Sequence, residues 1–112
     1  GSGINYCYPK RNQDLYAQLK SNHLIISEKP GDYVPQAKDF PSRNRLIAGL
    51  SESVLVTEAE KRSGTMITVG HALDQGKDIY CIPSRIGDPM GCNLLIQQGA
   101  KLVLTVNDII ED

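Results

Sequence analysis

The sequence contains no tryptophan and a single phenylalanine, so its core has to be built mainly from aliphatic side chains. No stretch approaches the roughly eighteen apolar residues of a membrane-spanning helix, and no secretory signal opens the chain. The three cysteines are an odd number without a C-x-x-C pair, which argues against a disulfide framework or a zinc knuckle. We therefore expect a cytoplasmic protein without membrane contact.

The chain also lacks a strong charge of one sign. A formal net charge of −1 over 112 residues excludes a histone-like nucleic-acid binder. Residues 1–50, however, carry seven basic and four acidic side chains, whereas residues 51–112 carry five basic and nine acidic ones. This split suggests that one end of the chain faces an anion, although a random scatter of solvated charges explains the counts about equally well.

The length fits one small domain, in which short apolar runs alternate with helical stretches. The runs are nearly continuous, as in strands that are buried on both faces of a parallel sheet. We expect strands at 23–27, 53–57, 78–82 and 101–105, and helices at 12–20, 41–50, 65–75, 93–98 and 106–111. This alternation predicts right-handed βαβ units and an α/β fold with a mostly parallel sheet.

Apolar side chains mark the buried sides of two of these helices. In helix 65–75 they are Met66, Val69, Ala72 and Leu73, and in helix 41–50 they are Leu46, Ile47 and Leu50. Gly76 and Gly99 stand where helices 65–75 and 93–98 are expected to end, as C-terminal glycines commonly do.

The first candidate anion site is the segment F-P-S-R-N-R at 40–45. It predicts a helix that begins at a proline and carries Arg43 and Arg45 in its first turn. Arg43 projects to the apolar side of this helix, where an arginine is costly unless an anion or an acid meets it. Its planar guanidinium suits phosphate, and the alternative is a structural salt bridge to an acid such as Asp39 or Glu58.

The second candidate is Ser63-Gly64-Thr65, which follows the strand at 53–57 and opens a helix. Two hydroxyls, a glycine that permits close backbone approach and a helix N-terminus together form a phosphate cradle. The alternative is that Ser63 is simply the helix N-cap. Because both candidates follow expected strands, a parallel sheet would bring them to one edge.

A third group combines Tyr6 and Tyr8 with Lys10 and Arg11. Aromatic rings and cations together suit single-stranded nucleic acid, in which bases stack and phosphates pair with cations, although tyrosine packing in the core is an alternative. Catalytic motifs are missing: Gly1-x-Gly3 lacks the third glycine of a dinucleotide fingerprint, and neither a P-loop nor a nucleophile elbow occurs. The residues thus show no catalytic machinery, and we expect no metal and no enzymatic activity.

Several motifs resemble the DNA-processing protein A family (DprA, also called Smf) in their order and spacing. They are Gly1-Ser2-Gly3-Ile4 with Tyr8-Pro9, Ser27-Glu28, the block F-P-x-R-N-R-x-I-A-G-L-S at 40–51, Val56-x-Glu58-Ala59, Ser63-Gly64-Thr65-x-Ile67-Thr68 and Gly91-Cys92-Asn93-x-Leu95-Ile96-x-x-Gly99-Ala100. The resemblance implies a Rossmann-like three-layer fold that binds single-stranded DNA. It also implies homodimers that load the recombinase RecA during natural transformation and recombination, and a domain that uses no redox cofactor.

By the same resemblance, specific residues would form the DNA pocket. They are Lys10, Arg43, Asn44 and Arg45, with Ser63, Gly64 and Thr65 on its floor and Lys38 at its rim. Subunits would pair through 79–96. The family's glycine-serine-arginine motif and the strands before it do not occur in this sequence. We therefore interpret 1–112 as the second half of a DprA-type domain that is truncated at its N-terminus, unless Gly1-Ser2-Gly3 is an artificial extension.

Two other functions stay open at this point. The chain could be a nucleotide-binding or nucleoside-monophosphate-cleaving enzyme in which Glu58 acts on a ribose, although the glycine-rich P-G-G-x-G-T-x-x-E stretch of such enzymes is missing. It could also be an interaction module that has lost ligand binding.

Overall fold

The computed structural model describes residues 1–111 and divides the chain into two compact units. The first unit comprises Gly1–Arg43, and the second begins at Asn44. The boundary falls inside a helix, α2 (Asp39–Gly49), so each unit contains part of it.

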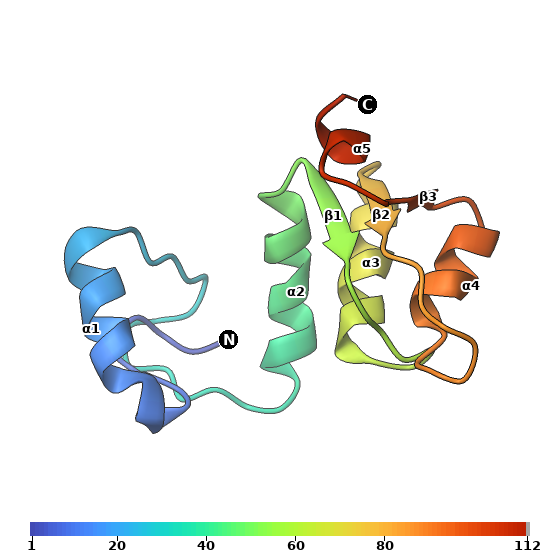
Figure 1. Ribbon diagram of the computed structural model, residues 1–112. Coiled ribbons are helices and arrows are strands. Elements are labelled where there is room, and N and C mark those ends of the chain that lie inside the picture. Colours follow the sequence, from blue (N-terminus) through green and yellow to red (C-terminus); the bar gives the residue numbers. More distant parts are fainter. Residues whose placement is uncertain (112) are drawn as a thin grey trace. The chain divides into compact units, whose positions relative to one another are not determined.

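The first unit consists of a short 3-10 helix, η1 (Lys10–Asn12), helix α1 (Gln13–Asn22), connecting segments and the beginning of α2 (Figure 1). Its N-terminal segment is hydrogen-bonded to the long segment before α2. The Gly3 amide donates to the Tyr33 carbonyl at 3.0 Å, and the Asn5 amide donates to the Gly31 carbonyl at 2.7 Å. The proline-rich connection is therefore held in place by backbone hydrogen bonds from the start of the chain.

The strand expected at 23–27 does not form, so that prediction is wrong. Within residues 1–111 this segment pairs with no strand, and Leu24 and Ile26 are 85% and 58% exposed. A strand is stabilised by hydrogen bonds to a neighbouring strand and by contacts on its faces, neither of which a local run of apolar residues supplies. Apolar composition alone therefore overestimated the number of strands.

The second unit is built on three parallel strands in the order β1-β2-β3. They are β1 (Ser53–Val56), β2 (Asp78–Cys81) and β3 (Lys101–Leu102). Val56 pairs with Cys81, and Cys81 pairs with Leu102. The three predicted strands in this half of the chain are thus confirmed, with β3 shorter than expected.

Two helices connect the three strands and cover the sheet. Helix α3 (Gly64–Asp74) joins β1 to β2, and α4 (Gly91–Gln97) joins β2 to β3, which Figure 1 shows beside the strands. Both connections step in the same direction along the sheet, an arrangement in which the usual right-handed crossovers put the two helices on one face. The helices and strands of the second unit enclose one buried hydrophobic cluster, which consists of Ala48, Val56, Ala59, Val69, Ala72, Ile79, Cys81, Cys92 and Leu95. The predicted α/β fold with a parallel sheet is confirmed.

Both long connecting helices end at the glycines that the sequence indicates. After α3, Gly76 has φ +74° and the Lys77 amide donates to the Ala72 carbonyl at 2.9 Å. After α4, Gly99 has φ +115° and the Ala100 amide donates to the Leu95 carbonyl at 2.9 Å. These are Schellman endings, in which the left-handed backbone favours glycine.

The last helix within residues 1–111 is the short α5 (Asn107–Ile110).

The burial of helix α3 agrees only in part with its predicted apolar side. Val69 and Ala72 are buried as expected, but Leu73 is 58% exposed, so its assignment to the core is wrong. Leu73 stands in the last turn of α3, where it borders a surface cavity beside the starts of β2 and β3. None of the helices in residues 1–111 is long and apolar enough to span a lipid bilayer.

Candidate functional site

Helix α2 begins at Asp39, two residues before the expected proline start. The Asp39 carboxylate accepts a hydrogen bond from the Gln36 amide at 2.8 Å and thus fixes the turn that precedes the helix. Arg43 and Arg45 consequently lie in the second turn, beyond the four residues whose N–H groups lack helical partners. The prediction of two arginines in the first turn is therefore wrong.

Asp39 is the centre of a buried polar cluster in the first unit. The carboxylate is 3% exposed, the Lys29 Nζ lies 3.3 Å from its Oδ1, and the Tyr33 hydroxyl donates to its Oδ2 at 2.8 Å. The Lys29 Nζ also lies 4.9 Å from the Tyr33 ring centroid. Lys29 is thus part of the scaffold and is not counted among the cations that could meet a ligand.

Hydrogen bonds around Asp39 shift the titration of the cluster. The Gln36 N–H, more than the Tyr33 hydroxyl and the Lys29 ammonium, holds the pKa of Asp39 below its usual value, although burial opposes this shift. The hydrogen bond to Asp39 raises the pKa of the Tyr33 hydroxyl. Asp39 is therefore ionised and Tyr33 protonated at neutral pH.

Four other cations of the first unit are exposed and form no ion pair within residues 1–111: Lys10, Arg11, Lys20 and Lys38. Arg43 is half-buried. Because the unit has six basic and four acidic side chains, its net charge is +2. The predicted residues Lys10, Lys38 and Arg43 therefore belong to a basic unit with accessible cations.

The remaining predicted residues belong to the second unit. The Asn44 side-chain amide donates to the Gly64 carbonyl at 3.4 Å, which joins α2 to the first residue of α3. The Arg45 carbonyl accepts a hydrogen bond from the Gln75 side chain at 3.2 Å, while the rest of Arg45 is exposed. The structure thus brings Asn44 to the start of α3, where three of the predicted residues lie.

The buried side of α2 differs from the one that its apolar stripe indicates. Ala48 is completely buried, whereas Ile47 and Leu50 are 47% and 73% exposed, so their assignment to the core is wrong. In the second unit α2 packs through its smallest apolar side chain, which allows close approach. Hydrophobic periodicity gives the apolar side of a helix but not the neighbour that covers it.

Ser63 precedes α3 in an extended conformation but does not cap it through its side chain. Its hydroxyl donates to the Glu60 carbonyl at 3.2 Å, so Ser63 occupies the N-cap position without the side-chain hydrogen bond that an N-cap usually provides. The N–H groups of Gly64 and Thr65 have no partner within residues 1–111. A Cβ added at Gly64 would meet no atom within 4 Å. This helix start is thus open to an anion.

The sequence suggested that each of the two candidate anion sites, 40–45 and 63–65, follows a strand. Only the segment 63–65 follows a strand, β1, because the segment before α2 contains no strand. The expectation that both candidate sites follow strands is therefore wrong. Of the eight predicted residues, Lys10, Lys38 and Arg43 belong to the first unit, and the other five belong to the second.

Two basic residues that the prediction omitted lie next to the start of α3. Lys61 and Arg62 are exposed, form no ion pair within residues 1–111, and line an open hollow of about 550 Å³ together with Glu60 and residues 87–90. The hollow lies between the loops that follow β1 and β2. The sequence feature that could have indicated these two residues is the basic pair Lys61-Arg62 itself, which stands directly before Ser63.

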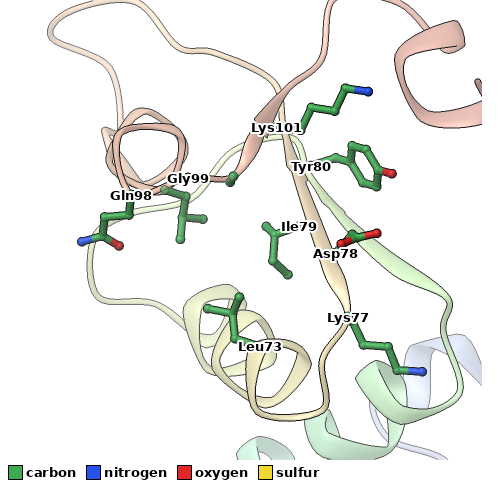
Figure 2. A pocket seen from close by; sticks show the side chains of 10 residues that line it. Leu73, Lys77, Asp78, Ile79, Tyr80, Gln98, Gly99 and Lys101 are labelled. Carbon is green, nitrogen blue, oxygen red and sulfur yellow. The ribbon is translucent and has the colours of Figure 1, made fainter. Parts of the chain in front are cut away.

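A second cavity, of about 360 Å³, lies at the other edge of the sheet, where β2 and β3 begin (Figure 2). Lys77, Asp78 and Lys101 are its charged lining residues, and the Lys101 Nζ lies 6.0 Å from the Tyr80 ring centroid. Lys77 also donates to the Gly49 carbonyl at 3.4 Å. None of the eight predicted residues lines this cavity.

The parallel βαβ arrangement and the open helix start define an α/β protein of Rossmann-like type. A family model for DNA recombination-mediator protein A matches residues 1–112, and the chain belongs to this family. The resemblance to DprA and Smf proteins is thereby confirmed.

Individual relatives agree with this assignment. The DNA processing protein DprA of Streptococcus pneumoniae is 42% identical over 114 residues, which are 100% of this chain and 40% of that protein. Protein Smf of Escherichia coli is 44% identical over 115 residues, 100% of this chain and 31% of that protein. The chain thus spans two fifths or less of the length of these relatives.

Solved structures show the same fold. The X-ray structure of DprA from Streptococcus pneumoniae superimposes with a TM-score of 0.91 at 42% identity and covers 99% of this chain and 40% of that one. A Helicobacter pylori DNA processing protein A structure superimposes with a TM-score of 0.88 at 29% identity, over 98% and 52% of the two chains. The latter is described as revealing a single-stranded DNA binding mode.

Proposed function

We propose that this chain binds single-stranded DNA as part of a DNA-processing protein. The observation that carries the proposal is the set of exposed cations without ion pairs in the first unit, Lys10, Arg11, Lys20 and Lys38. Membership of the recombination-mediator family supports it, as does the similarity to the Helicobacter pylori protein. Cations that no acid neutralises can release counterions from phosphates, which is the main source of affinity for nucleic acids.

The proposal assigns distinct roles to the predicted residues. Lys10, Lys38, Arg43 and Arg45 contact phosphates, the arginines through their planar guanidinium groups. The N–H groups of Gly64 and Thr65, with the hydroxyls of Ser63 and Thr65, receive a further phosphate oxygen. Asn44 holds the start of α3 in place through its hydrogen bond to Gly64.

A salt titration tests this function. A fluorescently labelled oligonucleotide is titrated with the chain at several salt concentrations, and the logarithm of the affinity is plotted against that of the salt. If each of the four assigned cations neutralises one phosphate, the slope is roughly −3. Affinity that does not change with salt, or absence of binding, would overturn the proposal.

The wider assignment is that the chain is the second half of a DprA-type domain. In it, homodimers pair through 79–96 and load RecA onto single strands in the cytoplasm during natural transformation and recombination. Exposed apolar side chains in this segment support the pairing surface: Ile86 is 95% exposed and Ile82 is 38% exposed. Sedimentation of the chain and of Ile86→Asp tests pairing, and RecA polymerisation on the oligonucleotide tests loading.

We propose binding without catalysis. The enzyme alternative relies on Glu58, which is exposed and follows β1. An exposed carboxylate is not enclosed in a pocket of the kind in which substrates are usually bound and converted. Incubation with nucleoside monophosphates distinguishes the two functions, because release of free base would establish the enzyme.

A further inference from the structure

Tyr8 is the one tyrosine of the five that is exposed, with 62% of its surface accessible. Its ring forms a tilted pair with the ring of Phe40, at a centroid separation of 5.7 Å and an interplanar angle of 42°. Both residues belong to the first unit. Phe40 therefore supports one side of a ring whose remaining surface is open to solvent.

Other tyrosines have structural roles that Tyr8 does not share. The Tyr16 hydroxyl donates to the Ile4 carbonyl, the Tyr33 hydroxyl donates to Asp39, and Tyr80 is buried in β2. The Tyr8 hydroxyl has no hydrogen-bond partner within residues 1–111. A large ring that is mostly exposed contributes little through burial, so the position of Tyr8 is not explained by packing alone.

Exposed cations stand close to both rings in the chain. Lys10 and Arg11 follow Tyr8 in η1, and Lys38 precedes Phe40 by two residues. An exposed aromatic ring among cations matches the chemistry of single-strand binding, in which a base stacks on the ring while neighbouring phosphates meet the cations.

We propose that Tyr8 stacks on a nucleobase of single-stranded DNA, with Phe40 holding its ring in place. This inference rests on the proposed function and adds the contact that distinguishes single strands from duplexes. In a duplex both faces of each base are covered by neighbouring bases, whereas in a single strand a base can leave its neighbours and stack on an aromatic side chain of the protein. The phosphate contacts alone do not make this distinction.

A tryptophan reporter tests the contact directly, because the chain contains no tryptophan. In Tyr8→Trp, the indole emission is expected to be quenched when an unlabelled single-stranded oligonucleotide binds. Leu24→Trp is the matched control, since Leu24 lies in the same unit and is 85% exposed. Quenching only in Tyr8→Trp supports stacking, and equal responses of the two variants overturn it.

Affinity measurements provide the second test. Tyr8→Ala is expected to weaken single-strand binding by about 5-fold to 150-fold, whereas Tyr8→Phe keeps the wild-type affinity. The salt slope stays the same because no charge is removed, and binding to a duplex of equal length is unchanged. If Tyr8→Ala does not fold, the tryptophan reporter decides the question.

The outcomes separate this inference from the proposed function. If the wild type binds with the expected salt slope and Tyr8→Ala binds equally well, stacking by Tyr8 is wrong and the proposed function stands. If the wild type does not bind the oligonucleotide, both are wrong.

Discussion

The backbone amide of Gly91 donates a hydrogen bond to the carbonyl oxygen of Ala59 at 2.7 Å, and a Cβ at residue 91 would lie 2.3 Å from that oxygen. Gly91 opens α4, and Ala59 lies in the loop between β1 and α3. This contact fixes the loop that leads to Ser63. The start of α3 is thus positioned by a contact that only glycine permits.

Gly91→Ala is expected to lower the free energy of unfolding by about 1–3 kcal/mol, because the added methyl group forces the loop and α4 apart. Urea denaturation followed by circular dichroism measures the change. Gly64→Ala is the matched control, since Gly64 is helical and its Cβ would meet nothing within 4 Å. It should be as stable as the wild type or more stable by up to about 1 kcal/mol. Equal stability of Gly91→Ala and the wild type would contradict the close contact.

Although Gly64→Ala should fold well, it is expected to weaken single-strand binding. The methyl group stands where a phosphate oxygen would approach the N–H groups of Gly64 and Thr65. A labelled oligonucleotide at fixed salt measures the loss. Unchanged affinity would show that no phosphate reaches this helix start, while the contacts assigned to Lys10 and Lys38 would be unaffected.

Lys38→Gln is expected to reduce affinity for single-stranded DNA and to make the salt slope less steep by about 0.7, the contribution of one phosphate contact. Lys20→Gln is the control: it removes the same charge from an exposed lysine of the same unit to which no direct phosphate contact is assigned. If both variants lose affinity equally, Lys38 acts only through the net charge of the unit.

Much of the second unit could be predicted from sequence, because local signals there agree with the tertiary structure. The runs that form β1 and β2 are bounded by polar residues, and Gly76 and Gly99 end their helices with the expected backbone conformation. Near-continuous apolar runs and helix-ending glycines can be recognised from the local sequence, because they depend little on distant residues.

The first unit was predicted less well because its structure depends on distant contacts. The segment 23–27 has the composition of a strand but no partner strand within residues 1–111. The start of α2 is set by Asp39, whose carboxylate bonds to Gln36, Tyr33 and Lys29. No spacing rule connects Lys29 to Asp39, so the sequence indicated the proline as the helix start.

The titration of Asp39 predicts loss of stability in acid. Its pKa in the folded chain is lower than the ordinary 3.8, mainly because of the Gln36 N–H. The ionised Asp39 carboxylate therefore contributes fully to the stability of the fold when the pH is above the ordinary pKa. This contribution is lost as the pH falls through the lower pKa of the folded state. Unfolding in urea at a series of pH values below about 4 measures this.

Asp39→Asn should show a weaker dependence of stability on pH in that range. Asp108→Asn is the comparison in the second unit, where the N–H groups of Thr105 and Leu104 lower the pKa of Asp108. A wild type and an Asp39→Asn variant with identical pH profiles would show that Asp39 is not the titrating group.

The cysteines are expected to differ in their reactivity. Cys81 and Cys92 are completely buried, and burial, followed by the neighbouring Cys92, raises the pKa of Cys81 to about 11. Burial also raises the pKa of Cys92. Since the thiolate is the nucleophile, a thiol reagent at neutral pH should modify only Cys7 in the folded chain. All three should react in denaturant, as mass spectrometry would show, and equally fast labelling of all three in the folded chain would contradict the buried arrangement.

The strand order β1-β2-β3 is also the order in which the ribosome makes these strands. Each strand pairs with the one synthesised before it, and the connecting helix has already emerged when the next strand appears. No strand of this sheet has to wait for a later one to be inserted between its neighbours. The second unit can therefore assemble stepwise during translation, with each βαβ step adding to a surface that already exists.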